Sequence, residues 1–500
     1  MRISEKRLHI WNQHWKSSRK KVLSINPFYT SSKAMTSFHL SITDLFRVTG
    51  LSLGLLLFSV SSLSAFSREM VTEPVFQSSV YLEEYGTENG HTVVLVHGTG
   101  DLGAKIWKST MSYLKDSFHV IAFDLPGFGR SEKKNELYSP ANYARFLKWL
   151  IDEKAKDTIT VIGHSMGGAI SLYFSGTYPD SLDHLILVDA AGVLHRASFT
   201  KSMINKHLKG EISVGGFDLL EQPLKDIKYL LGSTIEGVDN SLMPDNLDQL
   251  LASKTFRGTV LKGDPIRISG MAMIHTDFSS ILGRVKVPTA IIWGEADKIA
   301  PIRSAHLLAV NIENTSLTVL QERGHNPMLE DPESFNSILL QSIIEQDINP
   351  YPNISQRKTL PQNPPDRIIE GQEQLEISGD YERIIIRDSD AITIKNTTAQ
   401  RLLIEDANVS IINSRFEGDK QPAYIKDAVV FLTGVTVKGD TAITVNNSNL
   451  DLAGCHLIGQ KALIASEFIS SIVFSVTKTE GPDQTRFMHT VVKLKLGDTL

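Results

Sequence analysis

The sequence predicts an α/β protein with a mostly parallel sheet, followed by an all-β region built from repeats. Three observations support this prediction. Apolar runs alternate with helix-like segments from about residue 92 to residue 345, a proline-rich strip follows, and a repeat of about 20 to 22 residues then recurs. A chain of 500 residues is too long for a single hydrophobic core, so we expect two or more domains.

The first part of the chain carries the α/β pattern. Its strand-like runs are rich in Val and Ile and end in Gly, Asp or Ser: HTVVLVHG, FHVIAFDLPG, TITVIGHS, LDHLILVDAAG and PTAIIWGEAD. Helical patterns such as ANYARFLKWLIDEK lie between them. Strands that are apolar throughout and alternate with helices favour a parallel sheet covered on both faces. Residues 194–286 interrupt this alternation with a mostly helical stretch, which predicts an insertion between two strands.

The first 67 residues are set apart from the fold. Basic residues precede GLSLGLLLFSVSSLSAF, which runs from Gly50 to Phe66 without a charge. A basic flank before an uncharged apolar run is typical of a signal peptide or membrane anchor, with the basic side cytoplasmic. A start at Met35 would leave a conventional signal peptide, and a buried core helix is the alternative interpretation. The sequence therefore predicts export, with the remainder of the chain periplasmic, at the cell surface or anchored to the membrane.

Composition limits the chemistry. The net charge of −5 favours no polyanionic partner, so no nucleic acid is expected. Cys455 is the single cysteine, which excludes an intrachain disulfide and a cysteine-based metal cluster. No phosphate-binding loop or metal-ligand cluster is found, and we expect no metal and no cofactor.

Residues 349–370 are predicted to link two bodies, at 68–348 and 371–500. The segment NPYPNISQRKTLPQNPPDR carries five prolines and little apolar clustering. Beyond it, four segments with short alternating β runs end at Gly418, Gly439, Gly459 and Gly481. Repeats of this length without helices are typical of a parallel β-helix, which we expect to be right-handed. An antiparallel sandwich is the alternative.

A candidate nucleophile lies where a predicted strand passes into a predicted helix. The strand TITVI is followed by Gly163-His164-Ser165-Met166-Gly167-Gly168 and then by a helical segment. G-x-S-x-G in this setting predicts a sharp turn that lifts a serine out of the sheet, and the small neighbours make room for that turn. The helix N-terminus points its amides and positive dipole at whatever the serine attacks.

A serine nucleophile needs a base, and the base needs an acid that orients it. Asp297 lies in a turn just past an apolar strand in PTAIIWGEADKIAP. Between Asp297 and the proline-rich strip stand two histidines. His306 lies in a helical pattern that favours a packed or surface role, whereas His325 lies in a loop after the strand TSLTVL. The sequence therefore predicts a triad of Ser165, Asp297 and His325.

Backbone amides are predicted to stabilise the oxyanion. Met166 directly follows the nucleophile, and Thr99 follows the strand that ends in His97 and Gly98, so their amides form the expected pair. His97 precedes the serine and lies at a strand end, which favours a structural role for its ring. Asp124, in FDLPGFGRS, is expected to stabilise a turn rather than to act as the triad acid.

Residues from about 90 to 345 resemble the α/β-hydrolase superfamily. VHGTG, DLPGFGRS, GHSMGGA, WGEADKIAP and RGHNPMLEDPE match its patterns in order and spacing. The resemblance implies that residues 194–286 form a helical cap over the site. It is greatest to bacterial esterases and lipases and to carbon–carbon bond hydrolases of ring-cleavage products. Relatives that hydrolyse haloalkanes or epoxides carry aspartate where this chain has Ser165. The C-terminal repeats resemble pectate-lyase-like β-helices in repeat character alone.

These features predict a serine hydrolase that cleaves carboxylic esters through an acyl-enzyme. Phe, Met and Leu residues of the cap favour an apolar small-molecule or lipid ester. A carbon–carbon bond hydrolase is the nearest alternative. A third is an envelope- or polysaccharide-binding protein whose repeats contact glycan, with the hydrolase attached.

Overall fold

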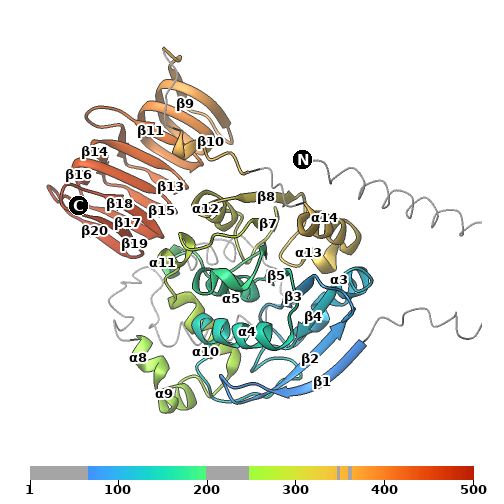
Figure 1. Cartoon of the computed structure of the whole chain (residues 1–500). Helices are drawn as coiled ribbons and strands as arrows, with labels where there is room; N and C mark the ends of the chain where they lie inside the picture. Colours follow the sequence, from blue (N-terminus) through green and yellow to red (C-terminus); the bar gives the residue numbers. More distant parts are fainter. Residues whose placement is uncertain (1–65, 199–246, 346–349, 358–362) are drawn as a thin grey trace, which may run out of the picture. The chain divides into compact units, whose positions relative to one another are not determined.

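The computed structural model describes residues 66–198, 247–345, 350–357 and 363–500 (Figure 1). All of them fall within one compact unit, Leu63–Leu500. The predicted signal or anchor segment up to residue 65, and residues 199–246 of the predicted cap, lie outside the described residues. Within the described ranges, no helix has both the length and the apolarity needed to cross a bilayer.

The first body of the described chain is built on an eight-stranded sheet in the order β1-β2-β4-β3-β5-β6-β7-β8. Its strands are β1 (Phe66–Thr72), β2 (Ser79–Tyr85), β3 (Thr92–Val96), β4 (His119–Phe123), β5 (Ile159–His164), β6 (His184–Val188), β7 (Thr289–Gly294) and β8 (Thr315–Leu320). The pairs from β4 to β8 are parallel. The prediction of a parallel sheet is therefore confirmed for these strands.

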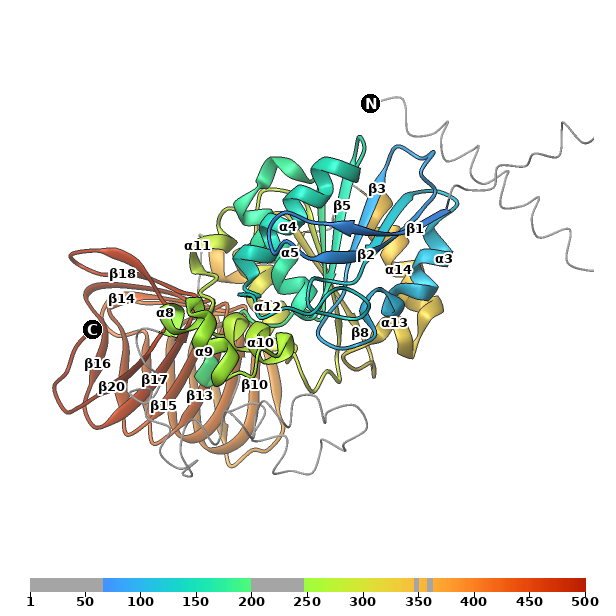
Figure 2. The ribbon, with the colours of Figure 1, turned by 90° about the horizontal axis from the view of Figure 1, so that it is seen from below.

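Helices cover both faces of this sheet (Figures 1 and 2). Those of the first body are η2 (Gly103–Trp107), α3 (Lys108–Leu114), α4 (Pro140–Lys154), α5 (Met166–Thr177), η3 (Pro179–Ser181), α12 (Arg303–Asn311), α13 (Pro327–Glu330) and α14 (Pro332–Ile344). Alternate residues of one strand enter different cores. In β3, Val94 and Val96 pack with α4, α5 and α12, whereas Val93 and Leu95 pack with α3 and α14. The unbroken apolar runs of the sequence follow from this burial on both faces.

Two antiparallel strands at one edge of the eight-stranded sheet do not show the apolar sequence pattern of the central strands. β1 pairs with β2, and β2 pairs with β4, both antiparallel. β1 is mostly exposed, and β2 buries Glu83 and Glu84. These strands lack the continuous Val and Ile character of the central ones, so the apolar pattern of the sequence does not indicate them.

Short helices form the described part of the insertion after β6. They are α8 (Leu247–Ala252), α9 (Lys254–Thr259), α10 (Pro265–His275) and α11 (Ser279–Leu282). α10 lies against the loops at the carboxyl ends of the strands. A side chain added at Gly192, after β6, would meet Met273 at 2.9 Å, and one at Gly127, after β4, would meet Pro265 at 2.9 Å. The described part of the predicted cap is thus helical.

The C-terminal region is all-β. Its strands are β9 (Arg367–Glu370), β10 (Glu376–Ile412), β11 (Arg415–Glu417), β12 (Ala423–Lys426), β13 (Val429–Thr433), β14 (Thr436–Asn446), β15 (Asn449–Ala453), β16 (His456–Ser466), β17 (Ser470–Ser475), β18 (Thr477–Glu480), β19 (Thr485–Met488) and β20 (Val491–Leu494). Successive repeats pair in parallel, as β13 with β15 and β15 with β17. β20 and β19 close the region with antiparallel pairs. Parallel pairing of the repeats contradicts the alternative of an antiparallel sandwich.

Equivalent positions of the repeats stack in ladders. Ile411, Leu432, Leu452 and Phe474 are paired in register and buried. Polar side chains stack in the same way at the bends. Asn413 donates to Asn396, the amide of Ala428 donates to Ser448 and the amide of Ser448 donates to Ser470, over separations of 17, 20 and 22 residues. The ladders give a reason for the recurrence of Asn and Ser in the sequence, because their side chains bond one another or accept from backbone amides at the bends.

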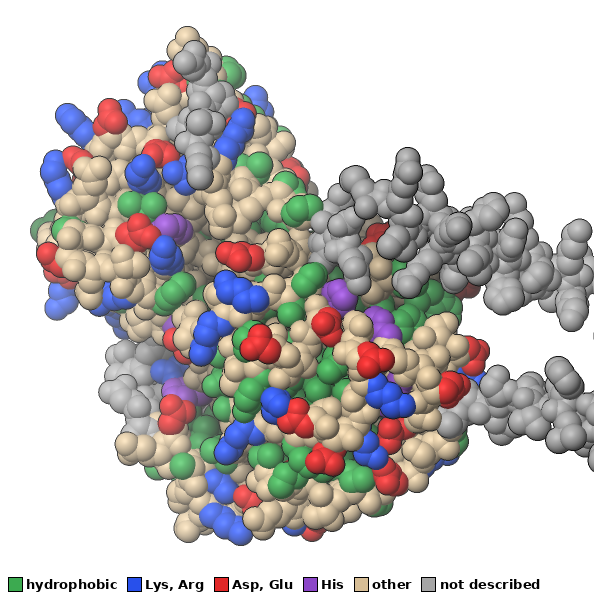
Figure 3. Space-filling view, viewed as in Figure 1, with side chains coloured by type: hydrophobic (Ala, Val, Ile, Leu, Met, Phe, Trp, Pro, Cys, Tyr) green, Lys and Arg blue, Asp and Glu red, His purple; other side chains and the backbone are tan. Residues whose placement is uncertain are grey.

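The outer surface of the repeats carries charges of both signs. Figure 3 shows acidic and basic side chains interspersed over the visible face of this region. Several form ion pairs between neighbouring repeats, including Arg387 with Glu405 at 2.8 Å and Lys438 with Glu417 at 2.6 Å. Such exposed pairs contribute little to stability individually.

The proline-rich strip makes hydrogen bonds to both bodies between residues 351 and 355, while most of its other described residues are exposed. The amide of Tyr351 donates to the carbonyl of Thr315 at 2.6 Å, and the Tyr351 hydroxyl lies 2.9 Å from His306 Nδ1. The amide of Ile354, in η6 (Ile354–Gln356), donates to Asn413 at 3.0 Å. The strip thus contacts both α12 of the first body and a bend of the repeats.

An ion pair between a partly buried arginine and a buried aspartate joins the first body to the repeats. Arg303, at the start of α12, lies 2.9 Å from Asp451 Oδ1, and it donates to the carbonyls of Asp451 and Leu432 at 2.6 and 3.0 Å. Ser198 donates to Asp451 Oδ2 at 2.7 Å, and the amide of His195 donates to Ser475 at 2.9 Å. Polar groups therefore make these contacts, and Asp451, Ser198 and Ser475 are buried there.

We predict that Asp451→Ala destabilises the protein by about 1–3 kcal/mol, because it leaves the partly buried Arg303 guanidinium without its anion. Urea unfolding of the whole chain measures this. Lys148→Ala is the control, since it removes an exposed pair with Asp152 on α4 and should cost less than about 0.5 kcal/mol. Equal losses in the two variants would contradict a structural role for the pair of Arg303 and Asp451.

Candidate active site

Ser165 lies between β5 and α5 with a backbone conformation that is rare for a residue with a side chain. Its φ is 52° and its ψ is −119°. Hydrogen bonds to the end of β6 and to the loop that follows it hold this turn. The amide of Ser165 donates to the carbonyl of Val188 at 3.0 Å, and the Ser165 carbonyl accepts from Ala191 at 3.1 Å. Such strain persists only where the surrounding structure fixes it, and it is common at functional sites.

The glycines around Ser165 allow the close packing of the turn. A Cβ at Gly163 would lie 2.3 Å from the carbonyl oxygen of Gly167, and one at Gly167 would lie 2.3 Å from that of Val96. At Gly168 it would meet the side chain of Ala190 at 2.5 Å. The prediction that small residues are needed beside the serine therefore has a direct steric cause.

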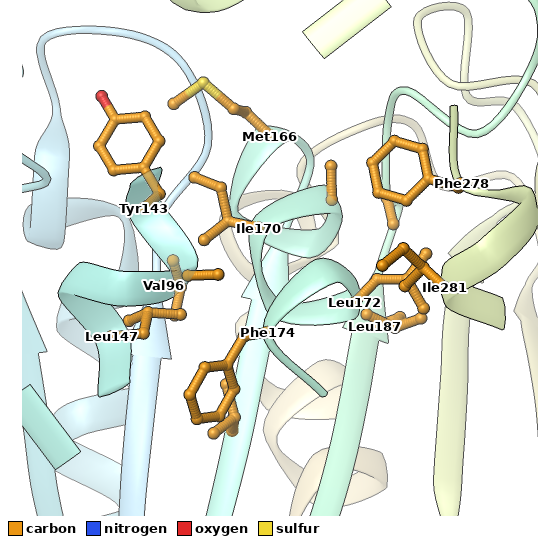
Figure 4. Close-up of a cluster of buried hydrophobic side chains, with 14 of the residues drawn as sticks. Val96, Tyr143, Leu147, Met166, Ile170, Leu172, Phe174, Leu187, Phe278 and Ile281 are labelled. Carbon is orange, nitrogen blue, oxygen red and sulfur yellow. The ribbon is translucent and has the colours of Figure 1, made fainter. Parts of the chain in front are cut away.

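Apolar packing fixes α5 below the turn (Figure 4). Ile170 and Phe174 lie toward β3 and α4, while Leu172 lies toward α11. All three are fully buried. The helix that carries Ser165 at its N-terminus is thus held on two sides.

The three residues of the predicted triad come together. His325 Nε2 lies 2.9 Å from Ser165 Oγ, and His325 Nδ1 lies 2.8 Å from Asp297 Oδ2. With its proton on Nδ1, the His325 ring donates a hydrogen bond to the Asp297 carboxylate and accepts one at Nε2 from the Ser165 hydroxyl. The side chain of Asp297 is fully buried and that of His325 is 10% exposed. The hydroxyl, imidazole and carboxylate have the order and spacing that nucleophilic catalysis requires.

Backbone amides fix the acid of this triad. Asp297 Oδ1 accepts from the amides of Ile299 and Ala300 at 2.7 and 3.0 Å. The amide bonds occupy one oxygen and leave the other, Oδ2, directed at His325. The turn after β7 thus holds the carboxyl group of Asp297 in a fixed orientation.

The residues predicted to supply oxyanion donors lie beside the serine. A Cβ at Gly98 would lie 2.8 Å from Ser165 Cβ, so the loop after β3 approaches the nucleophile closely. The Thr99 hydroxyl lies 3.7 Å from the Met166 sulfur. Met166 begins α5, where the first amides of a helix have no acceptor within the helix.

The other residues weighed from the sequence have structural contacts. His97 is buried, donates from Nδ1 to the carbonyl of Gly98 and accepts at Nε2 from the amide of Leu125. Asp124 accepts from the amides of Ala104 and Arg130 at 2.7 Å. Both hold the loops after β3 and β4, in agreement with the roles expected for them. His306, bonded to Tyr351, lies in the packed position expected from its helical pattern.

Two residues beside the triad were not singled out from the sequence. His164 donates from Nε2 to the carbonyl of His325 at 2.7 Å. Asp189, which follows β6, is fully buried and has a φ of 44°. A signal for Asp189 was present, because the carboxyl ends of adjacent parallel strands meet at one edge and β6 neighbours β7.

Asp189, Asp297 and His325 each offer one possible metal-ligand atom, and these three atoms lie within 4.8 Å of one another. They are therefore close enough to hold a metal ion. However, His325 Nδ1 and Asp297 are already hydrogen-bonded to each other. A metal would have to replace the proton that this bond shares.

The described first body has the α/β-hydrolase fold, and comparison with known proteins supports this. The family model described as alpha/beta hydrolase fold matches residues 91–207. The chain is 28% identical to a 2-hydroxy-6-oxononadienedioate/2-hydroxy-6-oxononatrienedioate hydrolase of Pseudomonas putida, over 51% of this chain and 88% of that protein. It is 28% identical to Lipase 1 of Psychrobacter immobilis, over 53% and 81%. The similarity to these two relatives supports the interpretation of this chain as a hydrolase.

Solved structures give a further likeness. An esterase from Thermogutta terrifontis is 22% identical and aligns with 55% of this chain and 98% of its own, with a TM-score of 0.41.

We predict that Gly167→Ala lowers the free energy of unfolding by about 1–3 kcal/mol, because the added methyl would press on the backbone of β3. Gly270→Ala, in α10, is the matched control. Apart from its chain neighbours and the backbone of its own helix, nothing lies within 4 Å of a Cβ there, so this change should stabilise the protein by about 0.5–1 kcal/mol. Thermal and urea unfolding of both variants test the prediction, and a stabilising Gly167→Ala would contradict it.

We also predict that the protein loses stability as the pH falls from 7 to 5. Burial lowers the pKa of His164 and of His195 to about 3, and that of His306 to about 4. In the unfolded chain these histidines protonate near pH 6.5, so below that pH the unfolded state gains protons that the folded state does not bind. The loss is on the order of 1 kcal/mol per histidine per pH unit. Urea unfolding at several pH values measures it, and His306→Gln should make the decline shallower.

Proposed function

We propose that this chain is a serine hydrolase that cleaves carboxylic esters through an acyl-enzyme. The observation that carries the proposal is the hydrogen-bonded series from Ser165 through His325 to Asp297, with separations of 2.9 and 2.8 Å. Separations of this size are within hydrogen-bond reach for proton transfer.

In the proposed mechanism, Ser165 Oγ attacks the carbonyl carbon of the ester while its proton passes to His325 Nε2. Asp297 holds the imidazole in the tautomer that leaves Nε2 free to accept, and it stabilises the imidazolium that forms. The alcohol then leaves with the proton from His325. Water, activated by the same histidine, attacks the acyl-enzyme, and release of the acid restores Ser165.

The amides of Met166 and Thr99 are proposed to bind the oxyanion of each tetrahedral intermediate. These hydrogen-bond donors are in position before the reaction begins, so they stabilise the charged transition state more than the neutral ester. In comparable enzymes one such donor lowers the activation free energy by about 3–4 kcal/mol. The positive end of α5 acts in the same direction.

We propose that the substrate is apolar, either a small molecule or a lipid. The proposal is supported by the apolar residues in the sequence of the insertion and by the lipase among the relatives. The name of the Pseudomonas putida relative gives a specific reason to retain a second candidate, hydrolysis of a carbon–carbon bond in a ring-cleavage product. Aryl esters and vinylogous diketones, tested side by side on the full chain, separate the two.

For the rest of the chain we propose export directed by the apolar N-terminal segment, which would either be cleaved or remain as an anchor. We further propose that the parallel repeats form a right-handed β-helix. Its stacked side chains suit a rigid scaffold, and glycan or envelope contact is the second role proposed for it.

Fluorophosphonate labelling and ester turnover test the hydrolase proposal. We expect Ser165→Ala to abolish labelling and to lower kcat by about 10⁴-fold or more. Ser175→Ala is the matched control, because Ser175 is a buried serine further along the same helix. It should label and turn over as the unchanged protein does. Labelling that survives in Ser165→Ala would contradict the assigned nucleophile.

A further inference from the structure

A second buried carboxyl group lies against the triad acid. Asp189 and Asp297 follow the neighbouring parallel strands β6 and β7, and oxygen atoms of the two lie within 4.8 Å. Asp189 has no exposed surface, and Asp297 is 4% exposed. Two carboxylates this close in a buried site cannot both be ionised without a large cost, so one of them is expected to keep a proton.

The hydrogen bonds show which carboxyl group is ionised. Asp297 accepts from the amides of Ile299 and Ala300 and from His325. Asp189 accepts at Oδ1 from the amide of Gly294 at 2.8 Å. Three donors stabilise the anion of Asp297, whereas a single amide bonds the other carboxyl group.

Of the two carboxyl oxygens of Asp189, Oδ2 is the one expected to carry the proton. Asp189 Oδ2 is fully buried and accepts from no donor within the described residues. An ionised oxygen in that position would be a buried charge without a partner, which is strongly unfavourable. A protonated Oδ2 instead becomes a donor, and Asp297 is the acceptor beside it.

We propose that Asp189 is a positioning residue, which keeps a proton on Oδ2 and donates it as a hydrogen bond to the carboxylate of Asp297. The bond fixes the orientation of Asp297 toward His325 and spreads part of its negative charge. Asp189 itself contacts neither the ester nor the reacting atoms. This inference rests on the proposed hydrolase function for its effect on turnover, although the protonation state can be observed without turnover.

The electrostatic surroundings agree with this assignment. Burial, followed by the charge of Asp297, raises the pKa of Asp189 well above its usual range, and the charge of Glu330 acts in the same direction. The neighbouring His164 stays neutral, because burial lowers its pKa to about 3. The positive φ of Asp189 is a conformation that Asn and Gly adopt readily.

Asn and Gly both adopt the positive φ found at position 189, so two substitutions can be compared there. They distinguish the loss of the ionisable group from the loss of the hydrogen-bond donor. Asp189→Asn keeps the shape and an N–H donor toward Asp297 but cannot ionise. Asp189→Gly removes the donor. We expect the Asn variant to keep kcat within about threefold, and the Gly variant to lose about 10- to 100-fold in kcat with little change in KM. Asp406→Gly is the control for glycine at an exposed position of the same backbone type, with a φ of 49°.

The pH profile distinguishes a proton donor from a second anion. If Asp189 is neutral, the acidic limb of kcat/KM is the same in the Asn variant as in the unchanged protein. A shift of that limb to lower pH by more than about half a unit would show that a negative charge had been removed, and it would overturn the proposal. Loss of activity in the Asn variant as large as in the Gly variant would overturn it as well.

Two readouts need no substrate. Difference infrared spectra at pH 7 should show the carbonyl stretch of a protonated carboxyl group that disappears in Asp189→Asn. The thermal midpoint of the Asn variant should rise relative to the unchanged protein between pH 5 and 8, because keeping Asp189 protonated costs more as the pH rises above its unfolded-state pKa. Absence of the infrared band overturns the proposal. Absence of fluorophosphonate labelling in the unchanged protein instead defeats the hydrolase function.

Discussion

The site depends on the left-handed backbone of Ser165. At a φ of 52° the chain turns sharply from β5 into α5, and the hydroxyl stands at the carboxyl edge of the sheet. The turn exists because Gly163, Gly167 and Gly168 leave space that side chains would fill, and because Val188 and Ala191 bond the Ser165 backbone. Packing therefore stabilises a conformation that a serine rarely adopts alone.

Four parallel strands then supply the remaining groups at the same edge. Gly98 follows β3, Asp189 follows β6, Asp297 follows β7 and His325 follows β8. Since the carboxyl ends of parallel strands lie side by side, groups far apart in the chain meet without a long loop. The low local dielectric strengthens each hydrogen bond among them, and it makes an unpaired charge correspondingly costly.

Residues that obey a local rule could be predicted from the sequence, whereas those fixed by tertiary contacts could not. The central strands showed their burial as unbroken Val and Ile runs, and the glycines around Ser165 followed a steric rule. The order of Ser165, Asp297 and His325 along the chain matched the pattern of the α/β-hydrolases that the sequence resembles. The antiparallel strands β1 and β2 lacked such a pattern. The Arg303 contact with Asp451 spans 148 residues, a separation at which no local periodicity acts.

The repeats are connected to the segments that carry both carboxyl groups. The chain that leaves β6 passes Asp189 and reaches His195, whose amide donates to Ser475. The chain that leaves β7 passes Asp297 and reaches Arg303, which bonds Asp451. A stacked parallel ladder is stiff, because each strand is bonded to the repeats on both sides. Each acid-bearing loop is thus bonded to the sheet at one end and followed by a residue bonded to the repeats at the other, while the repeats lend no group to the triad.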